Sequence, residues 1–511
     1  MKKKTLLGLL FSLVAVLFLV ACGGKAEKTV TSTSSSSTTE SSSKEEAVSG
    51  ASQREYTDPS ELKDSYDVVV VGSGGAGMAS AIAAKQAGAT VTVLEKMPII
   101  GGNTSKSSGG MNASETKFQK EQNIPDTNDL FYEESLKGGK GTNNPELLRY
   151  MVDNSAEAID WLDSIGITLS DVTFSGGFSQ PRIHRPADGS AVGGYLVNGL
   201  YNNLMENEIP IFVNADVTEI TEKDGAVSGV KVKVAGEEKT IAAKAVVDAA
   251  GGFGANMDMI TKEKPELDGY VTTNHEGATG DGIALAQKLG AATVQMDQIQ
   301  IHPTVYQEEG QDPFLVSEAI RGEGAILVNK EGNRFYNEME TRDNVSAAIN
   351  ALPEKHAFIV FGQDLREHSK SIDTYEERGM TVKADTIEDL AKEIGIPAEN
   401  LKATIEKWNG YVAAKDDTEF GRKTAMDRDI AKGPFYAIKI APGIHHTMGG
   451  LKINTNTEVL KEDGSAIPGL YAAGEVTGGV HGNNRMGGNA VADIVVFGRQ
   501  AGTKAAEFAK K

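Results

Sequence analysis

The chain has 511 residues, with 51 Lys and Arg against 71 Asp and Glu, so its formal net charge is −20. A surface with this charge repels nucleic acid phosphates, and we expect no nucleic acid partner. The chain also has 57 glycines and a single cysteine. One cysteine excludes an internal disulfide, a thiolate zinc site and a protein-ligated iron–sulfur cluster. We expect no metal, so redox chemistry on this chain would need an organic cofactor.

The N-terminus has the pattern of an export leader. Three lysines, Lys2 to Lys4, precede an apolar run from Leu6 to Ala21 that is short for a membrane span. The ending Leu19-Val20-Ala21-Cys22 resembles a bacterial lipobox, which implies cleavage before Cys22 and a lipid on its thiol. We therefore predict a signal peptide over residues 1–21 and an extracytoplasmic protein anchored to the cell membrane through Cys22. The alternative is an uncleaved helix with an incidental cysteine.

A polar segment follows the leader. Residues 31–43 are Ser or Thr except for Glu40, and mixed charges continue to about residue 65. Too little of this stretch is apolar to offset the entropy of ordering it. We predict a flexible tether over residues 22–65.

The folded part begins with a strand–turn–helix–strand pattern at Tyr66. Its turn, Gly72 to Gly77, reads GxGxxG, follows a Val-rich strand and opens an Ala-rich helix. In this context Gly72 permits the tight turn, Gly74 lets a pyrophosphate approach the backbone, and Gly77 allows the helix to pack closely. Glu95 ends the second strand, where its carboxylate can accept from both ribose hydroxyls. These features predict a dinucleotide site.

A second glycine-rich loop distinguishes FAD from NAD. It runs from Lys96 through Gly101-Gly102-Asn103-Thr104 to Gly109-Gly110, and a nicotinamide cofactor has no need of it. The loop resembles the one that lines pyrophosphate and isoalloxazine in FAD proteins related to succinate dehydrogenase and fumarate reductase flavoproteins. Near the C-terminus, the segment 469–479 is similar to the second FAD strand of that group. Gly488 then opens an apolar helix whose positive N-terminus would stabilise anionic reduced flavin.

Six separated strings extend the resemblance over residues 64–508. The chain resembles the soluble fumarate reductase family of single-chain FAD flavoproteins, which implies an α/β fold with a Rossmann-like FAD-binding domain and an inserted α+β capping domain. We place the FAD-binding domain at 66–300 and 441–511 and the capping domain at 301–440. The strings are Asn274–Gly282, His302–Thr304, Ser317–Gly322, Thr341–Asp343, His445–Gly450 and His481–Gly488.

The pattern and the resemblance together imply a set of FAD contacts, and we expect the cofactor to be bound non-covalently. The expected contacts are Gly72, Gly74, Gly75, Ala76, Gly77, Glu95, Lys96, Gly101, Gly102, Asn103, Thr104, Gly109, Gly110, Val217, Asp281, Gly474, Glu475, Gly488, Ala490 and Val491.

The resemblance also implies a site for a dicarboxylate such as fumarate or succinate. Guanidinium and imidazole groups suit two carboxylates, because Arg binds a carboxylate bidentately. It implies that Arg485 and His446 hold one carboxylate and that His302 and the Ser317 hydroxyl hold the other. Arg342 matches the proton donor of the family. Glu318 and Arg321, which are three residues apart, match the proton relay of the family. Glu318 also matches a residue of its substrate site. We give His445 no role beyond shaping its loop.

The electron source and the substrate leave alternatives open. With no haem motif and no cysteines for clusters, we expect electrons from a separate donor protein or quinol-linked carrier. The main prediction is reduction of fumarate to succinate as a terminal electron sink. One alternative is a reductase of another unsaturated acid, such as urocanate or an acrylate. A second is a surface flavoprotein that only passes electrons, and a third is a substrate-binding lipoprotein without catalysis.

Overall fold

A computed structural model describes residues 54–174 and 176–511. The predicted signal peptide, the lipid anchor Cys22 and most of the tether lie outside these residues. The last part of the predicted tether is packed on the body: Leu62 is buried, and the Thr57 N–H donates to the carbonyl of Ile211 at 3.0 Å. The predicted tether boundary at residue 65 is therefore too late. No helix of the described ranges is long and apolar enough to cross a membrane.

The central sheet is built from segments far apart in the chain. Its eight strands follow the order β18-β19-β9-β1-β2-β6, with β7 and β8 attached through β9, and the pairs among β19, β9, β1, β2 and β6 are parallel. In register, Val69 pairs with Val246, and Val246 pairs with Leu470. The strands are β1 (Ser65–Val71), β2 (Val91–Leu94), β6 (Ile211–Phe212), β7 (Ala215–Lys223), β8 (Ala226–Val234), β9 (Glu237–Asp248), β18 (Glu458–Leu460) and β19 (Ala466–Ala472).

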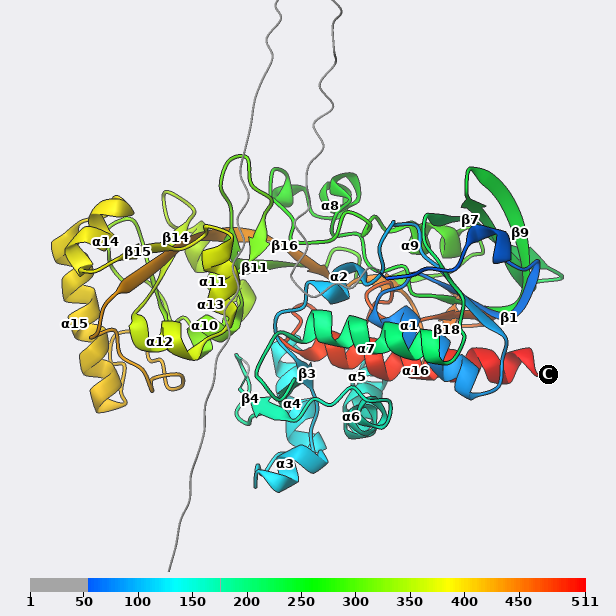
Figure 1. Ribbon diagram of the computed structural model, residues 1–511, viewed down its shortest axis with the longest axis horizontal. Coiled ribbons are helices and arrows are strands. Elements are labelled where there is room, and N and C mark those ends of the chain that lie inside the picture. The colour runs from blue at the N-terminus through cyan, green and yellow to red at the C-terminus, as the bar shows by residue number, and fades with distance from the viewer. Residues whose placement is uncertain (1–53, 175) are drawn as a thin grey trace, which may run out of the picture. The chain divides into compact units, whose positions relative to one another are not determined.

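Long helices pack on this sheet, as expected for strands buried on both faces. Helix α1 (Gly75–Gln86) lies along α16 (Asn489–Ala509) and next to α7 (Val192–Glu206) (Figure 1). The contact between α1 and α16 is close because two glycines of α16 face α1. A Cβ at Gly502 would overlap the carbonyl oxygen of Ser80, and the Ser80 hydroxyl donates to the carbonyl of Gly498 at 2.8 Å. The observed α/β architecture is the one the sequence predicts.

A second, antiparallel sheet has its own core. Its order is β12-β11-β16-β14-β13, with β15 paired to β16. Two clusters of buried apolar side chains around it draw only on residues 306–440. Its strands are β11 (Ile299–Tyr306), β12 (Phe314–Leu315), β13 (Ile326–Val328), β14 (Ala357–Phe361), β15 (Val382–Ala384) and β16 (Phe435–Thr447), and its helices are α10 (Glu318–Gly322), α11 (Arg342–Asn350), α12 (Gln363–His368), α13 (Ser371–Glu377), α14 (Ile387–Glu393) and α15 (Ala398–Ala414).

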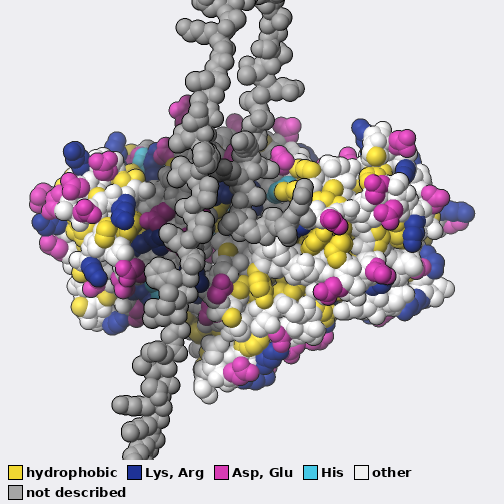
Figure 2. Space-filling model, in the orientation of Figure 1, with side chains coloured by type: hydrophobic (Ala, Val, Ile, Leu, Met, Phe, Trp, Pro, Cys, Tyr) yellow, Lys and Arg dark blue, Asp and Glu magenta, His cyan; other side chains and the backbone are white. Residues whose placement is uncertain are grey.

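Strand β16 connects the two parts. Its first half pairs with β14. Its second half pairs with β11 and ends near the first sheet (Figure 1, brown). Strands β11 and β16 thus run without a break across both predicted domain boundaries, at 300 and 440. On the face shown in Figure 2, Lys and Arg side chains are interspersed with Asp and Glu side chains over the described part of the surface.

Residues 111–185 form four further helices and a small sheet. The helices are α3 (Lys117–Glu121), α4 (Asn128–Gly138), α5 (Pro145–Asp153) and α6 (Ser155–Ser164), and the small sheet has the order β3-β5-β4, formed by β3 (Met111–Asn112), β5 (Ile183–Arg185) and β4 (Asp171–Thr173).

Candidate active site

The GxGxxG turn has the geometry that a dinucleotide site needs. Gly72 has φ +97°, which favours glycine, and a Cβ at Gly77 would overlap the carbonyl oxygen of Gly72. At Gly74, by contrast, a Cβ would meet only the Thr104 hydroxyl, at 3.8 Å. The first turn of α1 is therefore open at the position where a phosphate would approach.

Replacing Gly77 with Ala is expected to abolish FAD binding, because the methyl group cannot be placed without moving the turn from β1 to α1. Gly194→Ala in α7 is a matched control, since a Cβ there has nothing within 4 Å. The flavin absorbance of the purified variants measures the effect. A G77A protein that retains full flavin content would contradict this account of the turn.

Glu95 stabilises the turn directly. Its Oε2 accepts from the Ser73 N–H at 2.9 Å and from the Ser73 hydroxyl at 2.6 Å, while its Oε1 accepts from the Met97 N–H at 2.8 Å. Beside it, Lys96 forms an ion pair with Asp281 and donates to the Thr279 hydroxyl at 2.5 Å. Val217 is buried in β7, which begins next to Glu95.

A cavity of about 430 Å³ contains the flavin end of the predicted site. The predicted contacts that line it are Asn103, Thr104, Gly109, Gly110, Glu475, Gly488, Ala490 and Val491, whereas Gly72, Gly74, Gly75, Ala76, Gly77, Glu95, Lys96, Gly101, Gly102, Val217, Asp281 and Gly474 are not part of its lining. Helix α16 opens at this wall. Its N-cap, Gly488, has φ +86° and no side chain that caps the first N–H groups. This N-terminus, which no side chain caps, fits the electron-rich pyrimidine edge of a flavin.

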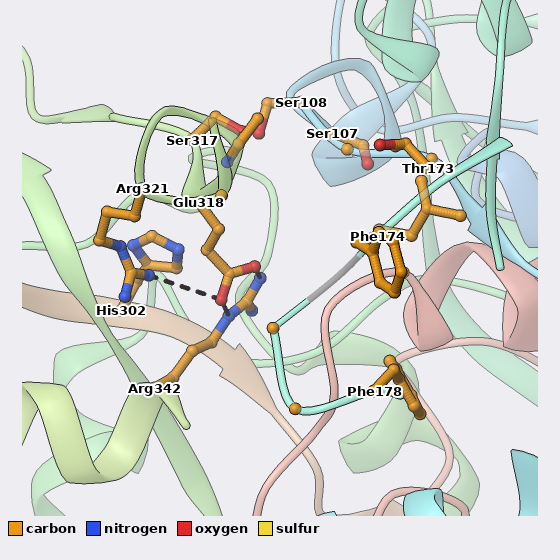
Figure 3. Close-up of a pocket in the computed structure, with 18 of the residues that line it drawn as sticks. Ser107, Ser108, Thr173, Phe174, Phe178, His302, Ser317, Glu318, Arg321 and Arg342 are labelled. Carbon is orange, nitrogen blue, oxygen red and sulfur yellow. Dashed lines mark hydrogen bonds and ion pairs between the residues drawn. The ribbon is translucent and has the colours of Figure 1, made fainter. Parts of the chain in front are cut away.

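All the residues predicted to act on substrate line the same cavity. They are His302, Ser317, Glu318, Arg321, Arg342, His446 and Arg485. Figure 3 shows Glu318 pointing to Arg342, with Arg321 and His302 beside it and Phe174 and Phe178 on the other side of the cavity. These groups come from β11, α10, α11, β16 and the loop before α16, so the fold collects them from a span of 184 positions between His302 and Arg485.

Arg342 and Glu318 form a bidentate pair. Arg342 Nε and Nη2 each donate to a different Glu318 oxygen at 2.8 Å. Burial alone raises the pKa of Glu318, but the charge and hydrogen bonds of Arg342 outweigh it and the pKa falls to about 2. Glu318 is thus a carboxylate at neutral pH. Arg321 Nη2 lies 3.7 Å from the same carboxylate.

Four buried nitrogen atoms of cavity residues have no hydrogen-bond partner among the described residues. They are His302 Nε2, Arg321 Nε, His446 Nε2 and Arg485 Nε. His302 Nδ1 accepts from the Thr304 N–H at 3.2 Å, so its Nε2 carries the proton and is a donor. Burial lowers the pKa of Arg485 to about 9, which leaves its guanidinium charged at neutral pH. The Nε2 of His302 and the Nε of Arg485 are buried donors without partners, which is costly, and an anionic ligand in the cavity would satisfy them.

His445 is a site residue that the sequence analysis missed. It lines the cavity, its ring centroid lies 5.1 Å from that of His302, and its Nδ1 lies 2.9 Å from the Thr273 hydroxyl. Neighbouring side chains on a strand normally point to opposite faces. Here the register of β11 and β16 shifts between the pairs Gln300–His446 and Ile301–Ile444, which leaves His445 in a β-bulge and redirects its side chain.

Gln300 was also missed, and it links two of the predicted residues. Its Oε1 accepts from Arg342 Nη1 at 2.9 Å, and its Nε2 donates to the carbonyl of Arg485 at 2.8 Å. No motif in the sequence marks this glutamine. Gln300 lies on β11, Arg342 on α11 and Arg485 in the loop before α16, so only the packing of these three segments places Gln300 between the two arginines.

The histidines make the folded state sensitive to acid. Burial is the main cause that lowers the pKa of four histidines, to about 4 for His184 and well below the usual value for the cavity residues His302, His445 and His446. Below the unfolded pKa near 6.5 the unfolded chain binds protons that the folded chain does not. The free energy of unfolding therefore falls by about 1.4 kcal/mol per pH unit for each such group.

Burial raises the pKa of Asp248 to about 7 and also that of Glu475, and these two groups act in the opposite direction. Four histidines lower the stability in acid and only two carboxyl groups raise it. We therefore expect a lower urea midpoint at about pH 5.5 than at about pH 7. An equal or higher midpoint in acid would contradict the neutral state of the buried histidines.

Comparison with known proteins identifies the family. The FAD binding domain model matches residues 67–491. The chain belongs to this family of FAD-binding flavoproteins. It is similar to NADH:fumarate oxidoreductase of Klebsiella pneumoniae, with 55% identity over 449 residues that cover 87% of this chain but 48% of the relative. The chain thus spans about half the length of that relative.

Two more comparisons indicate which kind of FAD-binding oxidoreductase the chain is. The chain is 43% identical over 470 residues to the fumarate reductase (cytochrome) of Shewanella frigidimarina, covering 91% of this chain and 81% of the relative. A solved structure of the open conformation of a flavocytochrome c3 fumarate reductase has a TM-score of 0.75 and 42% identity, covering 88% of this chain and 80% of that one. The chain is an FAD-dependent oxidoreductase of the fumarate reductase and succinate dehydrogenase type, which acts on CH–CH groups.

Proposed function

We propose that this chain reduces fumarate to succinate. The observation that carries the proposal is the cluster of unpartnered nitrogen atoms at His302, His446 and Arg485, which lines one cavity with the Arg342–Glu318 pair. Fumarate is a planar dianion with a carboxylate at each end, so it needs two separate groups of donors. The cluster lies at this cavity, and the Glu318 carboxylate there is already paired with Arg342.

One carboxylate would bind Arg485 and His446, and the other would bind His302 and Ser317. The Ser317 oxygen accepts from the Ala319 N–H at 3.2 Å as the N-cap of α10, so its own O–H is directed elsewhere and can donate to substrate. His445, in edge contact with His302, adds a further imidazole to this group. Donors that twist and polarise a carboxylate make the double bond more electrophilic, which lowers the barrier rather than only tightening binding.

When bound, FAD supplies the hydride that adds to one carbon of the double bond. The chain's own residues supply the proton to the other carbon, and we assign this to Arg342. Arginine is a weak acid with a pKa above 12, so it donates only if its proton is replaced at once. Glu318 contacts both Arg342 and Arg321, and it can pass a proton from Arg321 to Arg342 as the transfer proceeds.

We further propose that electrons come from a separate donor, and that the protein acts outside the cytoplasm as a lipoprotein. The single cysteine of this chain, Cys22, sits in the lipobox-like ending and provides no ligands for a cluster. Turnover with a reduced viologen but not with NADH supports the separate donor. Direct turnover with NADH would contradict it.

A panel of acids tests the substrate. Fumarate, urocanate and methacrylate are compared as oxidants of the reduced flavin under the same conditions. The proposal expects the highest kcat/KM with fumarate, because the cluster has donors for two carboxylates. Higher kcat/KM with urocanate or methacrylate would favour the alternative reductases, and no reaction with any of the three would favour a flavoprotein that only carries electrons.

A further inference from the structure

The helix that carries the proposed proton relay is too short to hold itself in place. Helix α10 has five residues, and isolated helices shorter than about 12 residues are marginal in water. Its position must therefore depend on contacts from other elements. At its N-terminal end, the Ser317 N–H donates to the Tyr375 hydroxyl of α13 at 2.9 Å. At the C-terminal end of α10, the contact comes from Arg422.

Arg422 is fully buried in the segment between α15 and β16, and all five of its N–H groups have acceptors. Nη2 donates to the carbonyl of Arg321, near the C-terminal end of α10, where a cation also complements the helix dipole. The acceptors are the carbonyl oxygens of Arg321 (2.7 Å), Ala325 (3.0 Å), Thr424 (3.1 Å) and Ala425 (2.6 Å) and a carboxylate oxygen of Glu338 (3.2 Å).

Glu338 connects Arg422 to the side chain of Arg321. The backbone carbonyl of Glu338 accepts from Arg321 Nη1 at 2.5 Å. Its side chain, with no exposed area, is held by Arg334 through two hydrogen bonds of 2.8 Å. The Arg422 guanidinium lies 4.6 Å from the ring centre of Trp408. Arg321 is thus fixed twice, at its main-chain carbonyl by Arg422 and at its guanidinium by Glu338.

We propose that Arg422 is a positioning residue of the proton relay: it fixes the C-terminal end of α10, and so holds Arg321 and Glu318 in line with Arg342. Arg422 does not itself line the cavity, so it acts through α10 and not on substrate. The inference rests on the proposed function for its kinetic consequence. The anchoring of α10 is a property of the free protein and can be measured without substrate.

Arg422→Lys is the decisive variant. It keeps the charge but has three N–H groups, so at least two of the five acceptors lose their donor. Arg428→Lys is a matched control, because Arg428 lies in the same segment and donates to the carbonyl of Glu323, just after α10, but only at 3.4 Å and from a side chain that is 24% exposed.

Hydrogen–deuterium exchange of the holoprotein tests the anchor. R422K is expected to speed exchange of the amides of residues 318–325 at least about tenfold, while R428K leaves them at the wild-type rate. Glu338→Gln, which removes the charge of one acceptor, is expected to give a smaller increase in the same amides and serves if R422K loses its flavin. Wild-type exchange in the variant that retains its flavin would overturn the proposal.

The two half-reactions test the consequence. Reduction of the flavin by a viologen does not use the relay, and R422K should match the wild type within about twofold. Reoxidation by fumarate needs the proton, and it should slow at least about tenfold with a larger solvent isotope effect. Equal slowing of both half-reactions would show a general structural role and overturn the proposal. A wild-type protein that fumarate cannot reoxidise would refute the proposed function instead, while the exchange data still decide whether Arg422 anchors α10.

Discussion

Replacing Arg342 with Gln is expected to lower kcat for fumarate about 10³-fold, the size of effect that a positioned proton donor supplies. Glutamine cannot donate a charged N–H to the substrate carbon. The substitution also removes both hydrogen bonds that Glu318 receives from Arg342. Arg321, at 3.7 Å from the Glu318 carboxylate, is then the nearest cation. Steady-state kinetics with a reduced viologen as donor measure the loss.

The flavin content of the Arg342 variant should match the wild type, because Arg342 contributes no contact to the GxGxxG turn or to the N-terminus of α16. Arg366→Gln is the control: this arginine forms ion pairs with Asp373 and Glu376 outside the cavity, and its removal should leave kcat unchanged. An R342Q enzyme with full flavin content and wild-type kcat would rule out Arg342 as the proton donor.

The second large effect is expected at Arg485, in binding. Arg485 is 5% exposed, its Nε has no partner among the described residues, and its charge survives burial at neutral pH. Loss of one partner of a buried ionic contact costs about 2–5 kcal/mol, so Arg485→Met should raise KM for fumarate at least about 30-fold. Arg485→Lys keeps the charge but loses bidentate geometry, so its KM should lie between those of the wild type and R485M.

Competitive inhibition provides a check that does not depend on turnover. Succinate or another saturated dicarboxylate should inhibit R485M much more weakly than the wild type. A monocarboxylate should lose less affinity, because the donors at His302 and Ser317 remain. Unchanged dicarboxylate inhibition would show that Arg485 does not hold a carboxylate.

Local sequence patterns were sufficient to predict the FAD-binding fold. The turn at Gly72 depends on its own backbone and on the strand and helix at either side, so its glycine spacing can be recognised without the rest of the fold. The segment 469–479 was expected to contain the second FAD strand, and β19 lies there in the same sheet as β1: Leu470 pairs with Val246, which pairs with Val69. Buried parallel strands have a continuous apolar pattern that makes them visible in a sequence.

Features set by long-range pairing were missed. His445 lines the cavity because of a bulge between β11 and β16, and Gln300 connects Arg342 to Arg485 because α11 and the loop before α16 both pack against β11. Gln300 is 42 positions from Arg342 and 185 positions from Arg485, and neither Gln300 nor His445 differs locally from an ordinary strand residue. The contacts of Arg422 with α10 are of the same kind.

Reoxidation of the reduced flavin by fumarate tests the central claim most directly. The holoprotein is reduced without oxygen, the excess reductant is removed, and fumarate is added while flavin absorbance and succinate are followed. The account predicts rapid return of the oxidised spectrum with one succinate formed per flavin, and loss of this reaction in R342Q. A flavin that stays reduced in the presence of fumarate, or that is reoxidised without succinate, would contradict it.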